Sequence, residues 1–248
     1  MQEPRLKDQR AGALEKLCNW PNSKVVGHFT SNTRGNGGVA TIAKKQFLDS
    51  TQNYVVTEVH DDECQHITFS LGSTLFSFAN VHMSQNGPLR GSLCKKLQNI
   101  LPVGTIIGGD FNMVQDVELD TLRPGSTQPY NNIGWQQLIE MQTALQLNDL
   151  WRLEQGDERV YTHLSNVQGG ITQTRIDFIL CPCNGMVAHY GLHASHDFAF
   201  WQGTGRADHI GVALALDQAD IAGAETKRRA VPPHIFDTQT WHNIHNDV

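Results

Sequence analysis

Short runs of apolar and β-branched residues, alternating with polar ones and separated by Gly, Asn and Ser, recur along most of the chain. A two-residue period of this kind is typical of β-strands with one buried face. Gly72-Ser73 provides a tight turn between two such runs, which predicts a hairpin. A chain with this many short strands needs a core built on sheets, because each strand has an apolar face to bury. The predicted strands are 25–26, 38–43, 54–59, 67–71, 75–81, 104–109, 161–164, 174–180 and 210–216.

Three segments break this pattern. Apolar residues at every third or fourth position predict amphipathic helices at residues 7–20 and 135–145, and residues 89–100 can also form a helix. The helices fall between groups of strands. We therefore expect an α/β fold in which a two-layer β-sandwich is flanked by helices.

The length of 248 residues allows one large core, and hydrophobic residues make up 39% of the chain while charged residues make up 18%. This composition favours a folded globular protein over a disordered one. After residue 216 the sequence becomes more polar and loses its period. We expect one domain over residues 1–216, monomeric when isolated, followed by a linker or tail over residues 217–248.

The charge pattern bears on location and partners. No apolar run approaches the ~20 residues needed to cross a bilayer, and the start, MQEPRLKDQR, is polar and charged, unlike a signal peptide. We expect an intracellular protein, nuclear or cytoplasmic, with no membrane partner.

The formal net charge of −6 is unlike that of a protein that coats DNA passively. A nucleic-acid enzyme can still be acidic, because a carboxylate-lined metal site adds negative charge while a local basic face contacts phosphate.

The strongest local motif is Gly108-Gly109-Asp110-Phe111-Asn112, at the end of a short apolar strand. Residues two apart in an extended chain point the same way, so Asp110 and Asn112 can address one phosphate or one attacking water. The same two residue types also favour an Asx-type turn after a strand. Both interpretations stay open at the level of sequence.

Two further motifs carry ionisable groups. Arg175 and Asp177 alternate with apolar residues on one predicted strand, and Asp208-His209 comes directly before another. An aspartate can hold the Nδ1–H of a histidine and leave Nε2 to accept a proton from water. Asp177 is the candidate partner of His209. Asp208 is then available to a hard ion such as Mg²⁺, which prefers carboxylates.

These motifs resemble those of the endonuclease/exonuclease/phosphatase superfamily, which includes DNase I and the exonuclease III type AP endonucleases. The resemblance rests on the Gly108–Asn112 motif, on Thr174-Arg175-Ile176-Asp177 and on Asp208-His209, in this order, and covers roughly residues 1–216. It implies a DNase I-like fold with four layers, α/β/β/α.

Two other stretches resemble the endonucleases of LINE-type non-LTR retrotransposons. They are Asp149-Leu150-Trp151-Arg152 followed by Tyr161-Thr162-His163, and Glu118-Leu119-Asp120. This likeness implies a Mg²⁺-dependent endonuclease, with Mn²⁺ as a possible substitute, that nicks DNA by phosphodiester hydrolysis. It also implies that Thr162 and Arg175 contact the nucleic acid.

The resemblance assigns roles within such a site. Gln2-Glu3 resembles the superfamily's Gln-Glu pair, which implies Glu3 as a metal ligand together with Asp208. His209, oriented by Asp177, takes the role of general base. Asp110 and Asn112 position the water and the phosphate. His82 supports the charge that develops on the phosphate.

The chain departs from the superfamily pattern in two places. If Glu3 is matched correctly, the superfamily's first strand, with its active-site asparagine, is missing, and we expect an N-terminally truncated domain with a weakened or open sandwich. His82 stands in Asn80-Val81-His82-Met83-Ser84, where LINE-type enzymes have other residues and DNase I has a histidine.

Two alternatives remain open. One is an enzyme of the same fold that acts on another phosphate ester, since common folds host many substrates. The other is an inactive remnant that keeps the fold and binds DNA without cleaving it.

Overall fold

The structure is a computed structural model that describes residues 25–29, 38–60, 63–125, 130–167, 170–182, 190–197 and 208–218. Both the helix predicted at residues 7–20 and Glu3 lie outside the described residues. In chain order the described elements are β1 (Val25–Phe29), β2 (Ala40–Lys44), α2 (Lys45–Ser50), β3 (Gln52–His60), β4 (Cys64–Leu71), β5 (Thr74–His82), α3 (Gly87–Ile100), β6 (Ile106–Asp110), β7 (Thr121–Leu122), α4 (Trp135–Leu145), β8 (Leu147–Asp149), α5 (Leu150–Gln155), β9 (His163–Val167), β10 (Gly170–Thr174), β11 (Asp177–Pro182), β12 (Tyr190–Asp197) and β13 (Gly211–Gln218).

The helices predicted at residues 89–100 and 135–145 are confirmed as α3 and α4. Local sequence explains where they begin and end. The Asn86 side chain caps α3 by accepting from the backbone N–H of Leu89, and α4 begins after Gly134, whose φ of 103° suits a glycine. Among the described helices, none combines the length and the apolar character that a transmembrane segment requires.

The run at residues 174–180, predicted as a single strand, is instead divided between β10 and β11. The break falls at Arg175 and Ile176, because the backbone N–H groups here donate hydrogen bonds to residues that are not in the strands beside β10 and β11. The N–H of Arg175 donates to the carbonyl of Asp120 at 2.9 Å, and the N–H of Ile176 donates to Oγ1 of Thr162 at 3.1 Å. The prediction of one continuous strand was wrong because period alone does not reveal where a strand changes partners.

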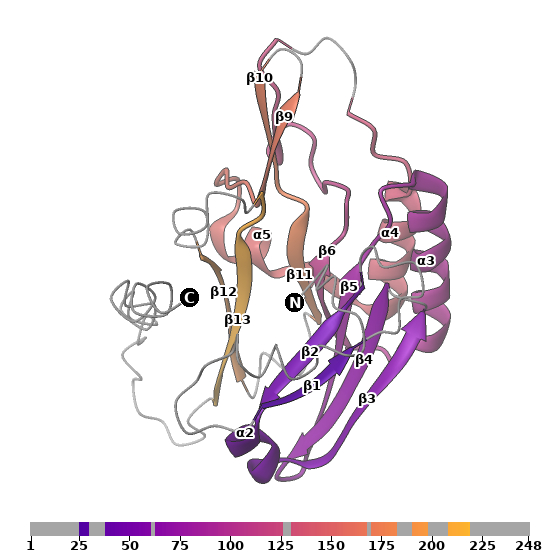
Figure 1. The fold of residues 1–248 in the computed structure, drawn as a ribbon, viewed down its shortest axis with the longest axis vertical. Coiled ribbons are helices and arrows are strands. Elements are labelled where there is room, and N and C mark those ends of the chain that lie inside the picture. Colours follow the sequence, from indigo (N-terminus) through magenta and orange to yellow (C-terminus); the bar gives the residue numbers. More distant parts are fainter. Residues whose placement is uncertain are drawn as a thin grey trace, which may run out of the picture.

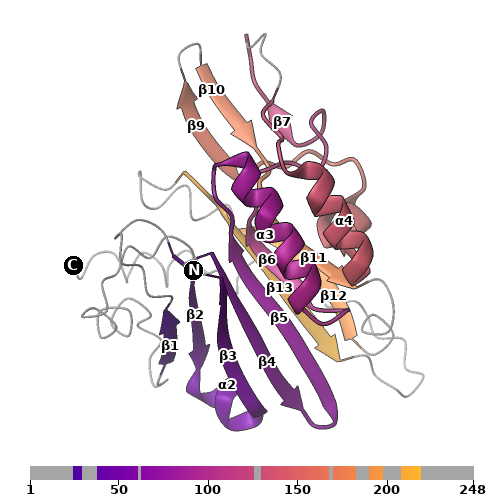
Figure 2. The ribbon, with the colours of Figure 1, turned by 90° about the vertical axis from the view of Figure 1, so that its right-hand side faces the viewer.

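A mixed six-stranded sheet in the order β3-β4-β5-β6-β11-β8 forms the centre of the molecule. Only β5 and β6 pair in parallel, and the other neighbours are antiparallel. The helices α3 and α4 lie side by side over one face (Figure 2). The pairs β1-β2 and β12-β13 lie on the other side, and α5 packs against β11 and β12 (Figure 1). This arrangement confirms the predicted α/β fold of layered sheets flanked by helices.

The second strand layer is in two parts. Among the described residues, β2 and β13 are each bonded to only one neighbouring strand. An apolar cavity of about 580 Å³ lies between them, over the central sheet. Its walls include Ala43 of β2 and Leu214 of β13, with Phe78 and Ile106 on the sheet side. The truncation expected from the sequence stays a prediction.

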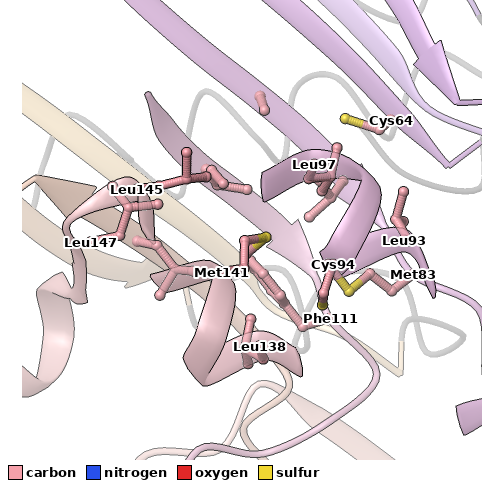
Figure 3. Close-up of a cluster of buried hydrophobic side chains, with 14 of the residues drawn as sticks. Cys64, Met83, Leu93, Cys94, Leu97, Phe111, Leu138, Met141, Leu145 and Leu147 are labelled. Carbon is pink, nitrogen blue, oxygen red and sulfur yellow. The ribbon is translucent and has the colours of Figure 1, made fainter. Parts of the chain in front are cut away.

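A cluster of buried apolar side chains fills the space between the central sheet and α3 and α4 (Figure 3). Within it the rings of Phe111 and Phe178 stack with 4.0 Å between their centroids. Each ring follows directly after an aspartate, Asp110 in one case and Asp177 in the other. The core therefore fixes the backbone from which both carboxylates project, since close-packed side chains leave little freedom to their neighbours.

Candidate active site

Three strands bring ionisable side chains to one rim of the central sheet. The parallel strands β5 and β6 end together, and the antiparallel strand β11 begins beside them. His82 lies opposite Asp110, and Asp110 lies opposite Asp177. Because cross-strand neighbours project from the same face of a sheet, the three side chains form a row across this rim. The hairpin of β9 and β10 projects beyond the sheet close to it (Figure 1).

The first group in this row is the turn made by Asp110 and Asn112. The backbone N–H of Asn112 donates to Oδ1 of Asp110 at 2.7 Å, so the Asx-type turn is confirmed. Asn112 has a φ of 51°, a left-handed conformation that asparagine tolerates. Its Nδ2 donates to the carbonyl of Met83 at 2.6 Å and to Oδ2 of Asp110 at 3.2 Å. The turn holds both predicted side chains together, and Nε2 of His82 lies 3.8 Å from Oδ2 of Asp110.

The second group is the pair formed by His209 and Asp177. Nδ1 of His209 lies 2.8 Å from Oδ2 of Asp177, as the sequence predicted. The backbone holds His209 in place from both sides: the N–H of Leu164 donates to the carbonyl of Asp208 at 2.7 Å, and the N–H of Ile210 donates to the carbonyl of Thr162 at 2.8 Å.

Electrostatics at His209 favour its charged form. Burial by itself lowers the pKa of this imidazole, but the hydrogen bond and charge of Asp177, with the charges of Asp110 and Asp208, raise it to about 9. A histidine normally titrates near 6.5. In the absence of a cation, His209 therefore carries its proton at neutral pH.

This shift predicts a pH dependence of stability in the metal-free protein. The folded-state pKa lies above the unfolded value, so the stabilisation from His209 is complete below pH 6.5 and is lost as pH rises to about 9. We expect the difference in unfolding free energy between the wild type and His209→Ala to be larger at pH 6 than at pH 9. Urea unfolding in EDTA at several pH values measures it, and a difference that grows with pH contradicts the assignment.

Two residues expected at the nucleic-acid interface are elsewhere. Thr162 is 0% exposed, and its Oγ1 accepts from the backbone N–H groups of Ile176 and Asp177 at 3.1 and 3.0 Å. Arg175 is also 0% exposed. Neither side chain can touch a nucleic acid from these positions, so this expectation is corrected: both support the start of β11, from which Asp177 projects.

Arg175 belongs to a buried network of charges below the rim. Its Nε donates to Oδ1 of Asp120 at 2.7 Å and its Nη2 to Oδ2 of Asp149 at 2.5 Å. Arg152 also pairs with Asp120. Burial lowers the pKa of Arg175, but Asp149 and Asp120 outweigh it and raise the pKa. Asp120 of one retrotransposon-like stretch and Asp149 of the other thus bind the same buried arginine.

Two further residues near this rim, Tyr130 and His163, have no role expected from the sequence. Burial raises the pKa of Tyr130, Arg90 lowers it and Asp110 raises it, so its phenol lies within electrostatic reach of the Asp110 carboxylate. Tyr130 lies in a loop with no regular spacing of apolar residues, and no motif in the sequence indicated that it would lie near the rim. The ring of His163 lies 4.5 Å from that of His209, centroid to centroid. Only the pairing of two distant segments reveals that contact.

The rim also offers ligands for a cation. One ligand atom from each of Asp110, Asp177 and His209 lies within 4.8 Å of the other two. Two carboxylates in such a set fit a hard divalent ion such as Mg²⁺, which prefers oxygen ligands. Asp208 is exposed and lies beside His209. Glu3 lies outside the described residues, and its role as a ligand stays a prediction.

The sequence matches no model of a protein family, and no curated protein is recognisably similar to it. Solved structures share its fold. An AP endonuclease from Archaeoglobus fulgidus is 18% identical, with a TM-score of 0.64 over 88% of this chain and 87% of its own. The 3′ phosphatase NExo from Neisseria, bound to a product DNA hairpin, is 16% identical, with a TM-score of 0.61 over 87% of each chain.

A third structure is the endonuclease domain of TRAS1, a telomere-specific non-LTR retrotransposon. It is 17% identical, with a TM-score of 0.53 over 79% of this chain and 80% of its own. Likeness at such identities establishes architecture. The DNase I-like fold predicted from the motifs is therefore confirmed.

Proposed function

We propose that this chain is a Mg²⁺-dependent phosphodiesterase that nicks DNA, of the type found in non-LTR retrotransposons. The observation that carries the proposal is the 2.8 Å contact between His209 and Asp177, within a cluster that also holds Asp110. A histidine oriented by one carboxylate and placed beside another is suited to activating water next to a phosphate.

His209 acts as the general base in this proposal. With Nδ1–H donated to Asp177, the tautomer of the neutral ring is set and Nε2 is directed to the proton of the attacking water. Asp177 is 5% exposed and stabilises the imidazolium that forms. The water loses its proton to Nε2 as its oxygen attacks phosphorus.

The other rim residues orient the reactants. Asp110 and Asn112, held in one turn, position the water and a phosphate oxygen, while His82 donates to the oxygens on which negative charge develops. Preorganised donors of this kind supply much of an enzyme's rate enhancement. Mg²⁺ or Mn²⁺, held by Glu3 and Asp208, would supply charge that polarises a nonbridging oxygen, stabilises the leaving 3′ oxygen and lowers the pKa of His209.

Sequence and fold both favour DNA as the substrate. The AP endonuclease and the NExo structure with its DNA hairpin are DNA-processing proteins of this fold. The stretches at 118–120 and 149–152 resemble LINE-type endonucleases, and the TRAS1 domain shares the architecture. The proposal includes a monomeric domain over residues 1–216, a tail over residues 217–248, and a nuclear or cytoplasmic location.

A second candidate function is hydrolysis of another phosphate ester on the same fold. His82 at the rim favours it over the LINE-type assignment, because the LINE-type enzymes have other residues at this position. An inactive remnant that binds DNA is the third possibility.

The test of this proposal compares substrates and metals. We expect the purified chain to convert supercoiled plasmid to the nicked form with Mg²⁺ or Mn²⁺, to stop in EDTA, and to resume when Mg²⁺ is added back. Phosphoinositides and mononucleotides are assayed beside the plasmid. Hydrolysis of those substrates alone supports the second candidate. Plasmid binding by gel shift, without nicking under any metal condition, supports the remnant.

A further inference from the structure

A second set of ligating side chains lies next to the proposed general base. One ligand atom from each of His163, Asp208 and His209 lies within 4.8 Å of the other two. The backbone explains why they meet. His163 and His209 form an antiparallel bridge although they are distant in sequence, and the N–H of Leu164 donates to the carbonyl of Asp208 at 2.7 Å.

Both rings are already oriented by hydrogen bonds at Nδ1. Nδ1 of His163 lies 3.2 Å from Oγ1 of Thr174, and Nδ1 of His209 lies 2.8 Å from Oδ2 of Asp177. When each Nδ1 carries the proton and donates it, the lone pair of each ring is on Nε2. Histidines that ligate metals are characteristically held this way, with the other ring nitrogen donating to a carboxylate, carbonyl or similar acceptor.

The composition of the set selects the kind of ion. Two imidazoles and one carboxylate suit Zn²⁺ and similar transition-metal ions, whereas Mg²⁺ and Ca²⁺ prefer oxygen ligands throughout. Three protein ligands leave a fourth position for water. Asp208 is exposed and both histidines are half-buried, so an ion can reach them from solvent.

We propose that His163, Asp208 and His209 form a binding site for a transition-metal ion of the Zn²⁺ class. The site adds His163 to two residues of the proposed catalytic machinery. A consequence, which rests on the proposed function, is inhibition: Zn²⁺ bound to Nε2 of His209 prevents that atom from accepting a proton, so Zn²⁺ suppresses the nicking that Mg²⁺ supports.

The binding test uses Zn²⁺ alone, without nucleic acid. Calorimetric titration of the full chain is expected to give a site whose affinity falls at least tenfold in His163→Ala and in Asp208→Asn. Loss of an orienting partner of a ligating histidine typically costs about 10–100-fold in metal affinity, and Thr174→Val is expected to fall in that range. Co²⁺ at the same site should give a visible absorption spectrum that changes in His163→Ala.

His66→Ala is the matched control. His66 is also half-buried and hydrogen-bonds a hydroxyl, that of Ser77 at 2.8 Å, but it lies on β4 outside the cluster. Its removal should leave Zn²⁺ affinity unchanged. Thermal unfolding establishes that each variant is folded, and Asp208→Asn, which is nearly isosteric at an exposed position, covers the case in which His163→Ala is not. Wild-type affinity in the folded variants of His163 and Asp208 overturns the proposal.

Failure of the Zn²⁺ site can be distinguished from failure of the proposed function. A chain that binds Zn²⁺ through these residues but never nicks DNA keeps the metal site and refutes the proposed DNA-nicking activity. If the chain nicks DNA, Zn²⁺ should inhibit the wild type at lower concentration than it inhibits the remaining activity of His163→Ala. Equal Zn²⁺ sensitivity of the two overturns the inhibitory site while leaving the nuclease intact.

Discussion

Replacing His209 with alanine should lower the rate of DNA nicking by about 10²–10⁴-fold, the usual contribution of a general base. The variant keeps Asp110 and Asn112 in their turn, because the hydrogen bonds that form it do not involve His209. DNA affinity should therefore change much less than kcat. Plasmid nicking under single-turnover conditions, beside a gel-shift measurement of binding, separates the two effects.

The matched control for this result is again His66→Ala, which removes an imidazole away from the rim and should nick at the wild-type rate. Asp177→Asn should lose most of the same activity, because it removes the acceptor that fixes the ring of His209. The double variant should lose little more than His209→Ala alone, since residues that act as a unit are not additive. Equal nicking by the wild type and His209→Ala would show that the observed activity comes from elsewhere.

The largest expected effect on stability comes from Arg175. Replacing it with methionine should lower the free energy of unfolding by about 3–5 kcal/mol, as measured when one partner of a buried ion pair is removed. Asp149 is 4% exposed and would stay buried without the guanidinium it binds, while Asp120, 0% exposed, would keep only its pair with Arg152. Methionine retains much of the side-chain volume, which limits any contribution from a cavity. Urea denaturation followed by circular dichroism measures the change.

Arg159→Met is the control for Arg175→Met, because it removes the same charge from an exposed position and should change stability by no more than about 0.5 kcal/mol. Combining Arg175→Met with Asp149→Asn should recover part of the loss, since the uncompensated charge of Asp149 is then gone while Asp120 keeps its pair with Arg152. A loss below about 1 kcal/mol in the single variant, against the magnitude expected for buried pairs, would mean that the network is open to water.

The position of Arg175 links stability to the candidate site. Its guanidinium lies 5.6 Å from the centroid of the Phe178 ring, and Phe178 follows Asp177 directly. Arg175 and the ring of Phe111 thus both pack against Phe178, the second residue of β11. Arg175→Met should therefore also disturb the contact between Asp177 and His209, and its nicking rate should fall even at temperatures where it remains folded.

Several features of this protein follow from local sequence alone. The spacing of apolar residues predicted α4, because a helix that buries one face needs that period wherever it occurs. Asp110 and Asn112 form their turn through bonds between residues two apart, which local chemistry suffices to specify. The pairing of His209 with Asp177 was also expected from the residue types and their resemblance to known nucleases.

Tertiary structure alone decided which polar side chains are buried and which partners they take. Arg175 was expected to contact nucleic acid, but it binds Asp120 and Asp149, which are 55 and 26 residues away. His163 meets His209 only because two separate segments pair. The local spacing of apolar residues indicates whether a segment is a helix or a strand and which residues lie on its buried face. It carries no information on which of the chain's many carboxylates will meet a given arginine, because that choice is made when strands distant in sequence pack together.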